Sequence, residues 1–209
     1  RKQILPRDTR YPMAKNIKTP YVIGLVGKAG SGKSTVARIL ADEYGFAVIA
    51  LDAVGHEALE LSRDELVKHF GPSILDENGT IQRSRLSKIV FNDMDKLITL
   101  NAITHPKIKS LVKERLKFIQ NHTILDGALL YEIGLAPFCD LILMVDAHES
   151  DLLHRLVQER HWSEEKARSV LYSQRHLQFL KEQADFIIFN NDGIEKIRRQ
   201  IDFFVNVLA

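Results

Sequence analysis

The sequence predicts an α/β fold built on a five-stranded parallel sheet. Five short apolar runs are each separated from the next by a helical pattern. The runs are continuously apolar rather than alternating, which indicates strands that are covered on both faces. A glycine-rich loop also joins the first run to the first helical pattern, as in nucleotide-binding α/β folds. The predicted strands are residues 21–27, 46–51, 123–126, 141–146 and 186–189.

The loop after the first predicted strand has the pattern G-x-x-x-x-G-K-[ST] of a phosphate-binding P-loop. Its N–H groups and the N-terminus of the next helix attract phosphate oxygens, and a helical pattern does follow, from Lys33 to Tyr44. We therefore expect ATP here, with Lys33 on the β- and γ-phosphates and the Ser34 hydroxyl on Mg²⁺. A plain glycine-rich turn is the alternative. The predicted ATP-binding residues of the loop are Gly27, Gly30, Ser31, Gly32, Lys33, Ser34 and Thr35.

Aspartates end the second, third and fourth predicted strands, as Asp52, Asp126 and Asp146. Ligands bind at the carboxyl ends of parallel strands, so we expect these acids on the P-loop side of the sheet. Asp52 is the candidate catalytic base that would orient and deprotonate an attacking hydroxyl. Its alternative role is to N-cap a helix predicted over 53–60. Asp126 closes a Walker B pattern and is a second candidate Mg²⁺ ligand, or else caps the following turn.

About seventy residues separate the second and third strands, which is too many for one crossover. Their patterns predict an inserted helical subdomain. A capping box from Ser62 to Glu65 predicts the start of one helix. Further helices are predicted over 84–91, 93–104 and 106–120, with a junction at His105–Pro106. His105 is a candidate substrate contact, and a capping or packing role is equally compatible with its position.

A second helical excursion lies between the fourth and fifth strands and is predicted to form a lid. Arg155 and Arg160 are its candidate phosphate-binding residues, because arginine neutralises the charge of a phosphoryl group during transfer. The alternative is a solvated helix face, since Glu159, Glu164 and Glu165 are also present. The last helix is predicted to begin with Asp192 as its N-cap.

Composition excludes several classes of protein. The chain has 209 residues, 45% of them hydrophobic and 27% charged, which is typical of a soluble globular protein. No stretch has the length of a membrane span, and no secretory signal pattern is present. The lone Cys139 excludes a disulfide framework and is interpreted as a small buried hydrophobe. We therefore expect a cytoplasmic protein that does not bind a membrane.

The net charge of +2 is unevenly distributed. Residues 1–20 hold six Lys or Arg and one acid, a net charge of +5, which leaves −3 for the rest. An acidic body disfavours nucleic-acid binding as the main function, although the tail is a possible basic arm. Met13 is a plausible natural start, so residues 1–12 are interpreted as an expression remnant or an extended start. The segment His56–Glu60 begins like the zinc-binding pattern H-E-x-x-H but lacks its second histidine, so no zinc site is predicted there.

Taken together, these residues resemble the dephospho-CoA kinase family from Tyr21 to the last helix. No single motif is specific, but their order and spacing are. The matching segments are Gly27–Thr35, Asp52, Phe70–Gly71 with Asn78–Arg83, Leu100–Pro106, Asp126–Glu132, the lid residues Arg155, Leu156, Ser163, Glu165, Ala167 and Gln174, and Lys181 with Ala184–Phe186, Ile188 and Asn190. The chain departs from the family at Lys28, where glycine is usual, and in the lid, where Glu159 replaces the second arginine and Arg160 follows it.

The resemblance implies a three-layer P-loop kinase fold with an inserted helical substrate subdomain and a helical lid. It also implies transfer of the ATP γ-phosphoryl group to the ribose 3′-hydroxyl of dephospho-CoA. Asp52, Lys33 and Arg155 would be catalytic, Asp52, Arg83 and His105 would bind the acceptor, and Asn190 would bind ATP. The expected organisation is a tail over 1–20 and one domain over 21–209, with core segments 21–54, 121–147 and 185–209, the insertion 55–120 and the lid 148–184.

Two alternatives remain open from the sequence. One is another P-loop small-molecule kinase, acting on a nucleoside or a sugar. The other is a nucleotide-binding switch or a nucleic-acid-dependent ATPase. The first would release ADP without dephospho-CoA, and the second would be stimulated by DNA or RNA with no small acceptor.

Overall fold

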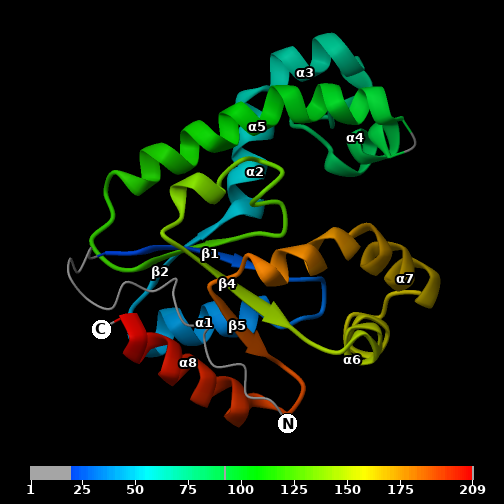
Figure 1. Ribbon diagram of the computed structural model, residues 1–209. Coiled ribbons are helices and arrows are strands. Elements are labelled where there is room, and N and C mark those ends of the chain that lie inside the picture. Colours follow the sequence, from blue (N-terminus) through cyan, green and yellow to red (C-terminus); the bar gives the residue numbers. More distant parts are fainter. Residues whose placement is uncertain (1–19, 92, 209) are drawn as a thin grey trace. The chain divides into compact units, whose positions relative to one another are not determined.

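The fold is described from a computed structural model, in which residues 20–91 and 93–208 are placed (Figure 1). Apart from Pro20, the predicted basic tail, with its candidate start at Met13, lies outside the described residues.

The predicted five-stranded parallel sheet is confirmed. The strand order is β2-β3-β1-β4-β5, and the central strand β1 pairs in parallel with β3 and β4. Leu25 of β1 lies opposite Asp126 on one side and Leu143 on the other, so the P-loop leaves the middle of the sheet. The strand bounds are β1 Val22–Val26, β2 Ala47–Ala50, β3 Thr123–Asp126, β4 Leu141–Asp146 and β5 Phe186–Phe189.

The second strand differs from the prediction of a buried strand that ends in aspartate. β2 lies at the edge of the sheet, and Val48 is 41% exposed. The strand stops at Ala50, and helix α2 runs over Leu51–Leu61 with Ala50 as its N-cap. Leu51 is buried together with Val54 and Ala58, which have helical spacing, so the last residue of the apolar run belongs to the helix. Asp52 therefore lies in the first turn of α2, neither at a strand end nor at the N-cap.

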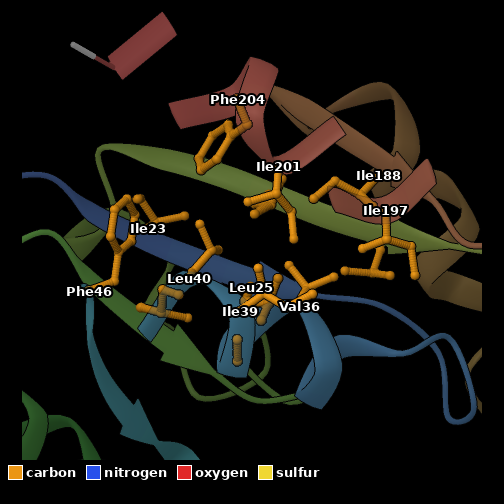
Figure 2. Close-up of a cluster of buried hydrophobic side chains, with 14 of the residues drawn as sticks. Ile23, Leu25, Val36, Ile39, Leu40, Phe46, Ile188, Ile197, Ile201 and Phe204 are labelled. Carbon is orange, nitrogen blue, oxygen red and sulfur yellow. The ribbon is translucent and has the colours of Figure 1, made fainter. Parts of the chain in front are cut away.

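Two helices, α1 over Lys33–Tyr44 and α8 over Ile194–Leu208, pack beside each other along the sheet (Figure 1). Their apolar faces meet side chains of the sheet in one buried cluster, which Figure 2 shows. Each large apolar side chain buried in this way contributes roughly 1.5–3 kcal/mol. Helix α8 begins two residues after Asp192, so that residue is not its N-cap; its carboxylate instead pairs with Lys196 Nζ at 3.0 Å. The cluster holds β1 and α1 together, and these are the two elements that flank the P-loop.

The chain divides into two compact units. The sheet unit holds the residues up to Val48, Gln120–Leu130 and the residues from Ala136 onward. The helical unit holds Ile49–Ile119 and Tyr131–Leu135. Besides α2, the helical unit contains α3 Arg63–Phe70, η1 Pro72–Ile74, α4 Arg83–Val90 and α5 Met94–Leu116. The lid belongs to the sheet unit and comprises α6 Glu149–His154, η3 Arg155–Glu159, α7 Glu164–Ser173 and η4 Arg175–Glu182; η2 Ala136–Phe138 precedes β4.

The helices predicted over 93–104 and 106–120 are one continuous helix, α5, with Pro106 inside it. Proline removes the N–H that would bond to the carbonyl of Ala102. Ala102 and Pro106 are both exposed, so water can solvate that carbonyl. Buried residues on each side of the proline, Thr104 and Ile108, hold the two halves on the same packed face. Packing therefore outweighs the break that proline predicts.

The predicted capping box is also wrong. Ser62 precedes α3, but its side chain makes no capping hydrogen bond. Ser62 is at the same time the C-cap of α2, and its N–H donates to the carbonyl of Ala58. This gives Ser62 a ψ of 10°, away from the extended conformation that an N-cap residue needs.

Candidate active site

The P-loop connects β1 to α1, and Asn190, just after β5, supports it. The Asn190 side-chain amide donates from Nδ2 to the carbonyl oxygen of Ser31 at 2.9 Å. Gly32 has a φ of 98°, and a Cβ on it would collide with this amide. Gly32 therefore meets two demands at once, a left-handed conformation and close contact with Asn190. The main chain of Asn190 is itself fixed, because its N–H donates to the carbonyl of Asp146 at 2.8 Å.

The loop presents polar groups that suit a phosphate chain. Among the described residues, the N–H groups of Gly30, Gly32 and Ser34 make no hydrogen bond. Ser31 Oγ is buried and has no partner in the described part of the chain, which is costly unless a ligand supplies one. Lys33 Nζ donates to the carbonyls of Gly27 at 2.6 Å and Lys28 at 3.2 Å, so its ammonium lies over the loop. This is a cradle of donors for anionic oxygens.

Lys28, the residue that departs from the family pattern, does not extend into bulk water. It is only 8% exposed, although it belongs to a surface loop. Its carbonyl accepts hydrogen bonds from the Ser31 N–H and from Lys33 Nζ. Lys28 therefore contributes to the folded loop through its backbone carbonyl, which accepts both of these hydrogen bonds.

Two of the predicted strand-end acids flank the P-loop strand. Asp126 ends β3 and Asp146 ends β4, on either side of β1. Asp146 forms an ion pair with Lys181 of the lid segment η4, at 2.6 Å, and that ammonium lies 5.2 Å from the centre of the Phe189 ring. The sequence placed Lys181 in a family pattern without a role, and this contact gives it one. It ties the end of the lid to the carboxyl end of β4.

The groups present fit Mg²⁺ held mainly by a nucleotide. In the described residues, no cluster of three His, Cys, Asp or Glu side chains has the arrangement of a metal site. Mg²⁺ commonly uses one or two protein oxygens together with substrate phosphates and water, so a dedicated cluster is not required. The Ser34 hydroxyl is exposed beside the cradle, and Asp126 ends the neighbouring strand. Both remain candidate ligands.

Arg155 opens one turn of π-helix, η3, in the lid. Its guanidinium donates to the carbonyls of Gly30 at 3.2 Å and Asn190 at 2.7 Å. Arg155 is therefore directed at the P-loop backbone and at the β5–α8 loop. Arg160 is exposed and C-caps the π turn, where its N–H donates to the Arg155 carbonyl at 3.2 Å. Turns of this kind often occur at functional sites.

The remaining candidates belong to the helical unit. Asp52 is exposed in the first turn of α2, and Arg83 is exposed at the start of α4. His105 is half-buried on α5. Burial lowers the pKa of His105, while a hydrogen bond to the backbone of Glu132 opposes the shift. His105 thus tends to stay neutral at physiological pH, which suits hydrogen bonding better than charge neutralisation.

The environment of Cys139 disfavours cysteine chemistry. Burial raises the pKa of the Cys139 thiol to about 12, so almost no thiolate forms at neutral pH.

Within residues 20–91 and 93–208, none of the helices is both long and apolar enough to cross a membrane.

Comparison with known proteins gives one consistent family. The sequence profile of dephospho-CoA kinase matches residues 21–196. A dephospho-CoA kinase of Fusobacterium nucleatum is 36% identical over 190 residues, covering 90% of this chain and 98% of the relative. One from Carboxydothermus hydrogenoformans is 36% identical over 187 residues, covering 86% and 90%.

Solved structures agree. A crystal structure from Thermus thermophilus superposes with a TM-score of 0.80 at 29% identity, covering 91% of this chain and 98% of that chain. Dephospho-CoA kinase from Campylobacter jejuni gives 0.63 at 26% identity, covering 90% and 97%. A shikimate kinase from Bacteroides thetaiotaomicron, at 16% identity and a TM-score of 0.55, shares the fold alone. The resemblance inferred from the motifs is confirmed, and the chain belongs to the dephospho-CoA kinase family.

Proposed function

We propose that this protein transfers the γ-phosphoryl group of ATP to the ribose 3′-hydroxyl of dephospho-CoA, giving coenzyme A and ADP. The observation that carries the proposal is the phosphate cradle of the P-loop, with Lys33 over it and Ser31 Oγ buried without a partner in the described chain, in a member of this family.

The transfer requires little covalent chemistry from the protein. The 3′-oxygen forms a bond to the γ-phosphorus while the bond from that phosphorus to the β–γ bridging oxygen breaks. Asp52 takes the proton of the hydroxyl. The P-loop N–H groups and Lys33 hold the phosphates in line with the attacking oxygen, and Arg155 stabilises the charge that spreads over the transferred group.

Bound Mg²⁺ would neutralise the β- and γ-phosphate oxygens, with the Ser34 hydroxyl as its first protein ligand and Asp126 as a second candidate. Gly27, Gly30, Gly32 and Thr35 shape the loop around ATP, and the segment 190–193 borders the adenine.

The helical insertion, 55–120, is proposed to bind the acceptor, with Arg83 and His105 in contact with it. The lid, 148–184, is proposed to cover the reacting phosphates and exclude water. The protein would act in the cytoplasm, where ATP and dephospho-CoA are available, and neither nucleic acid nor a membrane is a proposed partner.

An acceptor panel tests the function. ATP and Mg²⁺ are supplied with dephospho-CoA, with several nucleosides and sugars, or with no acceptor, and ADP release is measured. ADP should form at a substantial rate with dephospho-CoA only, and mass spectrometry should show one added phosphate on its ribose. Equal or faster phosphorylation of a nucleoside or sugar would instead identify another small-molecule kinase. Stimulation by DNA or RNA without an acceptor would identify an ATPase.

A further inference from the structure

The lid is bonded directly to the first half of the P-loop. Ala29 N–H donates to the side-chain oxygen Oε1 of Gln174 at 2.8 Å. Ala29 also packs against the buried apolar cluster of the lid, whose core is Leu152, Leu156, Ala167 and Leu171. The lid therefore holds Ala29 both by its methyl group and by its amide.

Gln174 is well fixed for this contact. It is the C-cap of α7, and its own N–H donates to the carbonyl of Val170 at 3.1 Å. Its carbonyl accepts the N–H of Leu177 at 3.1 Å in the following 3₁₀ segment, η4. Because both the N–H and the carbonyl of Gln174 are hydrogen-bonded, its backbone is fixed. The side chain therefore extends toward Ala29 from a fixed position.

The next residue of the loop is held by the lid as well. A Cβ on Gly30, whose φ is 78°, would lie 3.2 Å from the Leu152 carbonyl oxygen and 3.3 Å from Leu156 Cγ. The Gly30 carbonyl accepts a hydrogen bond from the Arg155 guanidinium. Contacts from α6, η3 and the end of α7 thus converge on two consecutive P-loop residues.

The N–H that donates to Gln174 and the carbonyl that accepts from Lys33 belong to the same peptide unit. The Lys28–Ala29 peptide has its N–H on Gln174, and its carbonyl, that of Lys28, accepts from Lys33 Nζ at 3.2 Å and from the Ser31 N–H at 3.1 Å. A peptide unit is planar, so fixing the direction of its N–H also fixes the direction of its carbonyl.

We propose that Gln174 is a positioning residue for phosphoryl transfer, which orients Lys33 through the Lys28–Ala29 peptide. The lid thereby aligns the P-loop lysine as well as covering the site. The proposal rests on the function proposed above only in that Lys33 acts on ATP.

The test compares three substitutions of Gln174 with a matched control. Gln174→Met keeps the length and removes the acceptor, and Gln174→Asn keeps the amide but is one methylene too short. Gln174→Glu keeps an acceptor oxygen and adds a negative charge. Gln183→Met makes the same exchange at an exposed glutamine at the end of the lid. Measurements are hydrogen exchange of the Ala29 amide by NMR, kcat and KM for ATP, and the melting temperature.

For Gln174→Met and Gln174→Asn we expect faster exchange of the Ala29 amide and a kcat lower by about tenfold, the scale of one hydrogen bond in a transition state. Their melting temperatures should match that of Gln183→Met. Gln174→Glu should restore slow Ala29 exchange but raise KM for ATP, because its charge lies near the phosphates.

Unchanged Ala29 exchange in both Gln174→Met and Gln174→Asn, or wild-type kcat in both, overturns the proposal. If Gln174→Met fails to fold, Gln174→Asn and Gln174→Glu decide it by the same two readouts. If the wild-type protein does not phosphorylate dephospho-CoA but its Ala29 exchange still depends on Gln174, only the proposed function is contradicted.

Discussion

Lys33 and Asp52 are the two side chains on which the proposed chemistry depends most. Lys33 lies over the P-loop, where its ammonium donates to the carbonyls of Gly27 and Lys28, and an incoming phosphate would compete with these carbonyls for it. Asp52 is exposed in the first turn of α2. Substitutions at these two positions therefore test the proposed chemistry most directly.

We expect Lys33→Ala and Asp52→Asn each to lower kcat by at least about a hundredfold. Lys33→Ala removes charge stabilisation of the transferred group, and Asp52→Asn removes the proton acceptor. Steady-state ADP release with dephospho-CoA measures the effect. Asp95→Asn is the matched control, because Asp95 is exposed in the first turn of another helix, α5, and carries no proposed role. Near-normal turnover in either active-site variant would exclude its catalytic role.

His122 is a structural histidine at the start of the sheet. Its Nδ1 accepts the backbone N–H of Tyr21 at 3.1 Å, and its ring packs against those of Tyr21 and Phe46, with centroid distances of 5.5 Å and 5.0 Å. Its carbonyl also accepts the N–H of Ala47. Burial lowers the pKa of His122 below 6.5, and an Nδ1 that accepts a hydrogen bond cannot carry a proton.

Stability should therefore fall in mild acid through His122. Since the folded pKa lies below the unfolded one, the neutral ring stabilises the fold above pH 6.5, and this is lost as the pH falls toward the folded pKa. Chemical denaturation of the wild type and His122→Gln checks this. The variant should be less stable by about 1–2 kcal/mol near neutral pH, and the difference should shrink as the pH falls below 6.5. A stability difference between the wild type and His122→Gln that stays constant over this pH range would refute the assignment.

At the scale of elements, the strands and the P-loop helix were predictable, and the corrections have a common cause. The strands over 123–126, 141–146 and 186–189 and helix α1 have the predicted bounds, because uniform apolar runs or a helical face marked them. The boundary between β2 and α2 was not predictable. Leu51 continues the apolar run, and only its packing with Val54 and Ala58 assigns it to the helix. A one-dimensional pattern does not show which neighbour buries a residue.

Helix α5 makes the same point and allows a test. Pro106 lies inside the helix and is exposed, as is Ala102, whose carbonyl lacks its helical partner. Pro106→Ala would restore that hydrogen bond and the helix propensity of alanine. We expect the free energy of unfolding to rise by about 1–3 kcal/mol, measured by urea denaturation. Lys107→Ala, at the exposed neighbouring position, should change it by less than about 0.5 kcal/mol. A loss of stability in Pro106→Ala would show that the proline shapes α5 rather than being tolerated in it.

At the scale of the whole molecule, the motifs were enough to place the chain in its family, but not to find the contacts that support the site. Asn190 bonds to Ser31 across 159 residues, and Gln174 to Ala29 across 145. Neither pair has a local signal, since each depends on strand order and on where the lid ends. The proposed ATP residues all belong to the sheet unit, whereas Asp52, Arg83 and His105 belong to the helical unit. The two substrates should therefore leave different footprints.

Hydrogen–deuterium exchange followed by mass spectrometry can separate these footprints. Binding lowers the population of locally open states wherever a ligand makes contacts, so exchange slows there. ATP with Mg²⁺ should protect peptides that cover 27–35 and the lid, 148–184. Dephospho-CoA alone should protect peptides around Asp52, Arg83 and His105, and Lys33→Ala should lose the first pattern while keeping the second. If dephospho-CoA protected the sheet unit only, the helical insertion would not be its binding element, and acceptor recognition would have to be assigned to the core.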